Sequence, residues 1–409
     1  MIKQFRAVSF IIGCLLILAP LAQADLSSPS KNISQSALDS VFPNVVHVPG
    51  TNTVMVCWIE TNGTCDFLLF SKSTDSGNTW SKPQWLTLTG QIQENDESGG
   101  YLGNHYALAM VVADPYVHIV IQWRQSEADD FEIHYRRSQN LGDSWGGWRQ
   151  ITDNSTDSRF PDVTARGSYV HVTYQDSWPG NEEIMYKRIS AYGGGSVDLT
   201  RRLTFSSTES FYPRIASSQD GSRISVVYED NAAVAFNIYL KTIETEGAGT
   251  FYTRQLTFGT DPFEGWNGLP DIATSAGTAP DDQYVYIVYQ ALWPGNMEIL
   301  YKRLDNYGLA AGGTTYTARL TYSSTDSQSN AIDFDPVTHD VHISYQDEWP
   351  GNYDVMSRRL SAFGGGGFTG SRISWGTGDS GQATVAAKGT DAYIAWADDT
   401  SGNYEIYIK

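Results

Sequence analysis

Residues 170–174 read Val-His-Val-Thr-Tyr, a run in which apolar and polar side chains alternate before an aromatic residue closes it. Alternation with a period of two, together with many Val, Ile and Tyr residues, predicts a strand rather than a helix. A repeat of this kind decides the architecture, because each copy is one structural unit. Similar runs recur every 51 to 65 residues and end at Trp58, Trp123, Tyr174, Tyr228, Tyr289, Tyr345 and Trp396.

Each copy contains three further segments that read as strands. One follows about ten residues later, as in 183–186, and another ends in an aliphatic residue before Thr or Ser, as in Leu203-Thr204. The remaining segment opens each unit, often after an aromatic-Pro pair such as Tyr212-Pro213. Four strands per unit without helical periodicity predict an all-β fold, a seven-bladed β-propeller with four antiparallel strands per blade.

The two ends of the chain complement each other. The seventh unit stops at Lys409 after its third strand, whereas Asn32-Ile33-Ser34 carries the missing aliphatic-Ser pattern. We therefore expect the N-terminal strand to complete the last blade and close the ring, which leaves no open sheet edge. Residues 25–409 then form one domain.

The N-terminus indicates the compartment. Residues 1–24 resemble a secretory signal peptide, since Lys3 and Arg6 precede an apolar run and Ala22-Gln23-Ala24 supplies small residues for cleavage. A membrane anchor is the alternative, but the run is short for a span. We expect a secreted or periplasmic protein. Its remaining cysteines, Cys57 and Cys65, lie eight residues apart and predict a local disulfide across one hairpin.

The charge excludes some partners. Lys and Arg total 27 against 46 Asp and Glu, and the net charge of −19 becomes −21 when Lys3 and Arg6 are removed with the signal. Nucleic acids and anionic membrane surfaces require a basic footprint, so both are disfavoured. We find no zinc spacing, phosphate loop or Ser-His-Asp signature and predict no metal and no cofactor, with a structural Ca²⁺ left open. We expect a monomer without a membrane span.

Two eight-residue turns resemble the Asp-box, Ser-x-Asp-x-Gly-x-Thr-Trp. The first spans 73–80 and the second 138–145. The acid can accept backbone N–H bonds within its own turn, the glycine supplies a positive φ, and the tryptophan packs the turn onto the sheet. We interpret these residues as structural. They are Asp75, Gly77 and Trp80 in the first box and Asn140, Gly142 and Trp145 in the second, where Asn replaces Asp.

These boxes and the repeat resemble the sialidase-like superfamily of β-propellers with BNR repeats. The resemblance implies a ligand site on the face opposite the boxes. Catalytic sialidases of this superfamily are six-bladed and use three arginines, a Tyr–Glu nucleophile pair and an Asp acid/base. Seven predicted blades, and the absence of their early Arg-Ile-Pro motif, disfavour classical sialidase activity. Some seven-bladed propellers with similar repeats are polysaccharide lyases that use His, Tyr and Arg, which is an analogy of fold alone.

On the implied ligand face, three loops repeat a Trp-Pro-Gly-Asn string. Pro, Gly and Asn favour a hairpin turn, which is enough to explain the string, but three tryptophans on one rim can also stack on sugar faces. We therefore predict a ligand-binding set on this face. It consists of Trp178, Trp293, Trp349, Asp176, Asp347 and Arg159.

The neighbouring loops are rich in acids, and the nearest cations are Arg124, Arg159 and Arg214. An acidic rim repels polyanions, so sialoglycans or uronates would need these arginines or bridging Ca²⁺. A neutral glycan or a protein fits more easily.

The catalytic candidates are His105, Tyr212 and Arg214. His105 lies in a long insert before the second blade and would act as a general base if the other two face it. The leading hypothesis is recognition, with or without cleavage, of an extracellular or cell-envelope glycan. The alternatives are a non-catalytic propeller that binds a surface protein, and a sialidase-like glycoside hydrolase or polysaccharide lyase.

Overall fold

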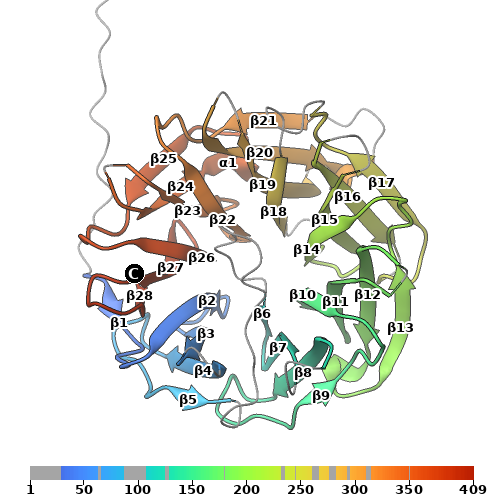
Figure 1. The fold of residues 1–409 in the computed structure, drawn as a ribbon, viewed down its shortest axis with the longest axis horizontal. Helices are drawn as coiled ribbons and strands as arrows, with labels where there is room; N and C mark the ends of the chain where they lie inside the picture. Colours follow the sequence, from blue (N-terminus) through green and yellow to red (C-terminus); the bar gives the residue numbers. More distant parts are fainter. Residues whose placement is uncertain are drawn as a thin grey trace, which may run out of the picture.

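The computed structural model describes residues 29–62, 66–86, 107–124, 129–178, 180–231, 235–244, 246–259, 267–275, 282–292, 295–309, 315–349 and 351–409. These residues form seven four-stranded antiparallel sheets arranged as blades around a central channel (Figure 1). The predicted seven-bladed propeller is confirmed.

In six blades the four strands run outward from the channel in chain order, and in the last blade β26, β27 and β28 are followed on the outside by β1. The innermost strands are β2 (Asp39–His47), β6 (Leu108–Ala113), β10 (Ser158–Arg166), β14 (Ser210–Ser217), β18 (Asn267–Thr274), β22 (Ser327–Phe334) and β26 (Ser380–Lys388). The second strands are β3 (Val54–Thr61), β7 (Tyr116–Trp123), β11 (Tyr169–Asp176), β15 (Arg223–Asp230), β19 (Tyr284–Leu292), β23 (Val341–Asp347) and β27 (Asp391–Asp398).

The third strands are β4 (Asp66–Ser73), β8 (Glu132–Ser138), β12 (Glu183–Ile189), β16 (Asn237–Glu244), β20 (Met297–Asp305), β24 (Asp354–Leu360) and β28 (Glu405–Ile408). The outermost strands are β5 (Gln84–Trp85), β9 (Arg149–Gln150), β13 (Val197–Arg202), β17 (Phe251–Gln255), β21 (Thr315–Arg319), β25 (Phe368–Arg372) and β1 (Lys31–Asn32). Single helical turns, η1 (Ala191–Gly193), η3 (Asn306–Gly308) and α1 (Ser361–Gly364), lie between third and fourth strands.

The ring closes as the sequence predicts. Strand β1 pairs with β28, with Asn32 opposite Tyr407, and the Ile33 N–H donates to the Ile406 carbonyl at 2.8 Å. Buried apolar clusters lie between neighbouring blades, and the cluster at the closure joins Trp58 and Ile33 to Ile406. The closure is therefore a hydrophobic seam as well as a strand pair.

The propeller has two faces, which we name for the loops that form them. The upper face carries the loops from second to third strand and the loops between blades. The lower face carries the remaining turns, including both Asp-boxes. In the first box, Asp75 accepts hydrogen bonds from the Thr79 N–H (2.8 Å) and hydroxyl (2.6 Å), and Gly77 has φ of 80°. The hydroxyl of Thr79 is the main reason that the pKa of Asp75 is lowered to about 2.

In the second box, Asn140 Oδ1 accepts from the Ser144 N–H at 2.9 Å and Gly142 has φ of 83°. Trp80 packs against the buried cluster between the last blade and blade 1, and Trp145 packs against the cluster between blades 1 and 2. The amide of Asn140 therefore substitutes for the carboxylate, and both boxes are structural turns.

The predicted Cys57–Cys65 disulfide stays a prediction, because Cys65 lies outside the described residues. Cys57 lies on β3 opposite Phe70, and burial raises the pKa of its thiol.

Neighbouring blades are also joined by a repeated polar contact. Every innermost strand except β6 carries a bulge. At five of these bulges the N–H of a residue at positive φ donates to a Gln or Glu of the preceding blade. Gln122 accepts from Phe160 (2.8 Å), Gln175 from Tyr212 (3.1 Å) and Glu229 from Leu269 (2.6 Å). Glu229 is 2% exposed, and burial raises its pKa to about 8.

Replacing Glu229 with Gln, the residue used in neighbouring blades, should remove a pH dependence of stability. Because the folded pKa is raised, the carboxyl group stabilises the fold fully below pH 4.5 and this contribution is lost as pH rises through 8. We expect Glu229→Gln to match the wild type near pH 4 and to be more stable at pH 9 by an amount on the order of a few kcal/mol. Urea unfolding at both pH values measures the difference, and parallel pH profiles would contradict this assignment.

Candidate functional site

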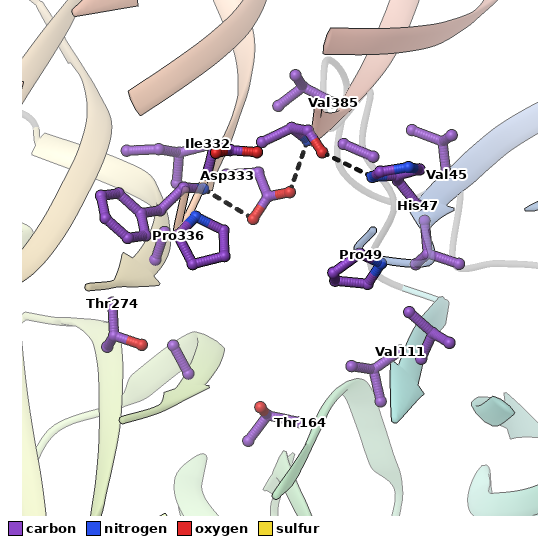
Figure 2. A pocket seen from close by; sticks show the side chains of 18 of the residues that line it. Val45, His47, Pro49, Val111, Thr164, Thr274, Ile332, Asp333, Pro336 and Val385 are labelled. Atoms are coloured by element: carbon purple, nitrogen blue, oxygen red, sulfur yellow. Dashed lines mark hydrogen bonds between the residues drawn. The ribbon is translucent and has the colours of Figure 1, made fainter. Parts of the chain in front are cut away.

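The central channel contains a cavity of about 570 Å³ lined by the innermost strands and by turns of the lower face (Figure 2). Its charged side chains are engaged in joining blades. The carboxylates of Asp162, Asp271 and Asp333 accept backbone N–H bonds from another innermost strand at 2.8, 3.0 and 2.8 Å. Figure 2 shows Asp333 with its two hydrogen bonds across from His47 and Pro49. Burial raises the pKa of all three acids, to about 7 for Asp271.

Arg214, a predicted catalytic residue, belongs to this channel. It is 7% exposed, and its guanidinium lies 3.9 Å from Asp162. Tyr212 lies two residues earlier, on the bulge, where its ring packs 5.0 Å from that of Phe160. His105 lies outside the described residues, so the predicted triad of His105, Tyr212 and Arg214 stays a prediction. Among the described residues, no group of three His, Cys, Asp or Glu side chains is arranged to hold a metal ion.

The predicted ligand-binding residues separate into two groups. Trp178 and Trp349 are exposed, at 62% and 57%, on equivalent loops of the upper face. Asp176 and Asp347 are buried, and each binds the N–H of its own tryptophan and the hydroxyl of Ser158 or Ser327 at 2.9 Å. The two acids therefore position the tryptophan loops, and ligand contact is left to the rings. Trp293 lies outside the described residues.

A further position on the upper face breaks the symmetry of the ring. At five seams between blades, the carbonyl of the residue before the third strand accepts an N–H from the next innermost strand at 2.7–3.3 Å. Four of these residues are aromatic and one is a carboxylic acid. They are Phe131, Glu182, Phe236, Tyr353 and Tyr404. The residue that follows is polar in every one of these blades, so Glu182 departs from the repeat at this one position.

Glu182 is partly buried in a polar setting. Gln175 links it to the bulge of the next blade, donating to Glu182 Oε2 at 3.2 Å while accepting from the Tyr212 N–H. Burial is the main reason that the pKa of Glu182 is raised to about 7; nearby Arg159 lowers it, and Asp176 and Asp157 raise it. A carboxyl group that holds its proton near neutral pH can donate it to a leaving oxygen.

Arg159 connects Glu182 to the neighbouring seam. It forms an ion pair with Asp157 at 2.7 Å, and its guanidinium lies 4.8 Å from the ring centre of Phe131. Arg124 covers the same ring at 4.5 Å. Two of the three arginines predicted from sequence thus meet over the Phe131 ring, and one of them, Arg159, is close enough to lower the pKa of Glu182. Sequence reasoning missed Glu182 itself, although aligning the loops shows an acid where other blades have aromatic residues.

Comparisons with known proteins give the fold. No family model matches the chain, and no curated protein matches it. An α-L-arabinanase from Penicillium chrysogenum, solved with arabinobiose, has a TM-score of 0.50 at 12% identity, with 81% of this chain and 97% of that chain covered. An α-L-arabinofuranosidase of Fusarium graminearum has a TM-score of 0.49 at 10% identity, covering 93% of this chain and 98% of that one. The NanB sialidase of Streptococcus pneumoniae scores 0.49 at 10% identity, covering 80% and 68%.

At these identities the comparison shows a shared fold. It confirms the predicted propeller fold, and both Asp-box turns carry the hydrogen bonds expected within that motif. Within the described residues, no helix is long and apolar enough to cross a membrane.

Proposed function

We propose that this protein binds a neutral glycan on its upper face and hydrolyses a glycosidic bond, with Glu182 as the proton donor. The observation that carries the proposal is Glu182, whose pKa is raised to about 7 at a seam where four other blades have aromatic rings. Glycoside hydrolysis requires an acid that is protonated at the working pH and a second carboxyl group. Asp157, which is held by Arg159 and close enough to raise the pKa of Glu182, is the candidate for the second role.

The charges favour a neutral ligand. Arg159 is paired with Asp157 and Arg214 lies against Asp162, so both cations already face carboxylates. The net charge of −19 adds a general repulsion of polyanions. The arabinanase of the same fold was solved with arabinobiose, a neutral disaccharide, which is consistent with this class of ligand.

The experiment is a release assay. The purified protein, without residues 1–24, is incubated at pH 6 with arabinan, galactan, xylan and glucomannan, and with sialyllactose and polygalacturonate as anionic comparisons. We expect new reducing ends from at least one neutral polymer and none from the anionic ones. Unsaturated uronate absorbance would instead identify a lyase, and the absence of products from every neutral polymer would overturn the cleavage.

A second candidate function, glycan recognition without cleavage, is favoured by the exposure of Trp178 and Trp349. Large exposed rings on loops pinned by buried acids provide stacking surfaces of fixed position. A protein partner is the alternative occupant of this face. We also propose that residues 1–24 direct export, which N-terminal sequencing of the mature protein from the periplasm or medium would test.

Trp178→Ala and Trp349→Ala are expected to weaken binding of the recognised polysaccharide by about tenfold each, because each removes a stacking ring without disturbing the blade. Affinity electrophoresis in gels containing the polymer measures the change. Trp85→Ala is the matched control, since Trp85 is 51% exposed but belongs to the outermost strand of blade 1. Equal retardation of all three variants and the wild type would exclude the tryptophan loops from the site.

A further inference from the structure

The rim of the upper face presents an exposed aromatic ring on four consecutive blades. Each ring directly follows the aliphatic-Thr or aliphatic-Ser pair after an outermost strand, β13, β17, β21 or β25, which succeed one another around the perimeter (Figure 1). The side chains are 64–73% exposed, whereas the aliphatic residues two positions earlier are buried. We call these four residues the rim arc. They are Phe205, Phe258, Tyr322 and Trp375.

Three rings of the rim arc rest on an arginine of the preceding strand. Arg202, Arg319 and Arg372 place their guanidinium carbons 4.7, 4.5 and 4.3 Å from the ring centres of Phe205, Tyr322 and Trp375. Stacking of a guanidinium on an aromatic face is attractive and fixes the plane of the ring.

The arginines are themselves held in place. Each forms an ion pair with a fully buried acid of the third strand, Glu183, Glu298 or Asp354. Each also donates through Nε to the carbonyl just before the aromatic residue, at 2.7–3.0 Å. In blade 4, Gln255 makes the same carbonyl contact at 2.8 Å beside Phe258. One face of each arginine-stacked ring thus packs on a side chain that is itself held by hydrogen bonds, and the rest of the ring is exposed to solvent.

The fold does not require aromatic residues at this position. The equivalent residues are Gln35 in the last blade and Asp153 in blade 2. Large apolar side chains exposed in a row on a soluble surface indicate an interaction site. The rim arc therefore needs an explanation beyond the stability of the blades.

We propose that the rim arc binds an extended, neutral polysaccharide chain that runs along the rim of blades 3 to 6. Sugar rings present flat C–H faces that stack on aromatic rings, and a repeating polymer matches a surface that repeats once per blade. Hydroxyl-rich loops separate the rings, as at Ser206, Ser323 and Thr377, and offer partners for sugar hydroxyls.

The arrangement fits a protein partner less well. The core of a protein interface is a contiguous apolar patch, whereas these rings are separated by polar loops of successive blades. The negative net charge disfavours a polyanionic chain.

The rim arc adjoins the candidate site at one end. Phe205 precedes Ser206, whose carbonyl accepts from the side chain of Asn181 at 3.4 Å, and Asn181 precedes Glu182. A polymer on the rim arc would therefore have one part close to Glu182. Binding by the rim arc needs no cleavage, so it extends beyond the proposed function and can be tested separately.

The test compares Phe205→Ala/Tyr322→Ala/Trp375→Ala with Tyr252→Ala, a matched control whose ring is 49% exposed on β17. All are made in the full mature chain carrying Glu182→Gln, so that hydrolysis does not alter the polymer. Affinity electrophoresis with arabinan, galactan, xylan and glucomannan gives polymer affinity, isothermal titration with arabinobiose gives affinity for a short ligand, and sedimentation velocity gives the oligomeric state.

We expect the triple variant to lose at least tenfold in affinity for the retarding polymer, with Tyr252→Ala unchanged and the thermal midpoint of all variants preserved. The affinity for arabinobiose should stay the same. Retardation of the triple variant equal to that of its parent, or no retardation of the parent by any neutral polymer, would overturn the proposal. A parent dimer that the triple variant converts to monomer would also overturn it, because the rings would then bind a second copy of this chain. Polymer binding by the parent, together with no cleavage by the wild-type protein, would contradict only the proposed function.

Discussion

Replacing Glu182 with Gln is expected to lower the rate of glycosidic bond cleavage by roughly 10²–10⁴-fold, the usual contribution of a general acid. Gln has the same shape and keeps the hydrogen bond to Gln175 but carries no transferable proton. The affinity for the glycan should therefore stay within about twofold of the wild type, so that the loss falls on kcat. Reducing-end release at saturating polymer measures the effect.

The pH profile gives a second readout of Glu182. Because its folded pKa is raised to about 7, the acid is protonated below pH 7 and the wild-type rate should fall as pH rises above that value. The residual rate of Glu182→Gln should not show this decline. Glu209→Gln is the matched control, since it removes an exposed carboxylate of the same face and should leave both rate and profile unchanged. Equal rates in Glu182→Gln and Glu209→Gln would show that Glu182 is not the acid.

The architecture could be predicted from sequence because its causes are local and repeated. Alternating runs specify strands, the boxes specify turns, and the pattern at Asn32-Ile33-Ser34 matches the strand missing after Lys409. The disulfide could not be judged in this way, since spacing does not give register, and it stays a prediction because Cys65 lies outside the described residues. Strands and turns could therefore be predicted because every blade repeats them. The same repetition does not indicate which residues form the site.

The candidate site depends on departures from the repeat. Asp176 and Asp347 were predicted to bind ligand because they belong to a repeated loop string. Recurrence is typical of structural roles, however, and both side chains hold their loops to the blade. Among the five described seams an acid occurs only at Glu182, and this departure is visible only when strand pairing shows that Phe131 and Phe236 occupy the same position. A functional residue in a symmetric ring is best sought where one blade differs from the others.

Gly193→Ala is expected to reduce the free energy of unfolding by about 2–5 kcal/mol, combining overpacking with the strain of a left-handed backbone. Gly193 has φ of 78°, and an added Cβ would lie 1.8 Å from the hydroxyl oxygen of Tyr135 in the preceding blade. That ring cannot move easily, because it is 3% exposed and hydrogen-bonded to His118 at 2.7 Å. The turn glycine therefore sets how closely two blades approach.

Gly50→Ala separates the two causes of this loss. Gly50 has φ of 74°, but an added Cβ would meet nothing within 4 Å, so the variant reports backbone strain of about 1 kcal/mol alone. Gly247→Ala repeats the test at the next seam, where the added Cβ would lie 1.9 Å from the hydroxyl oxygen of Tyr186. Urea unfolding of the three variants should rank Gly50→Ala well above the other two in stability. Equal losses in all three would mean that the glycine–tyrosine contact does not hold the blades in register, and that apolar packing at each seam does so without it.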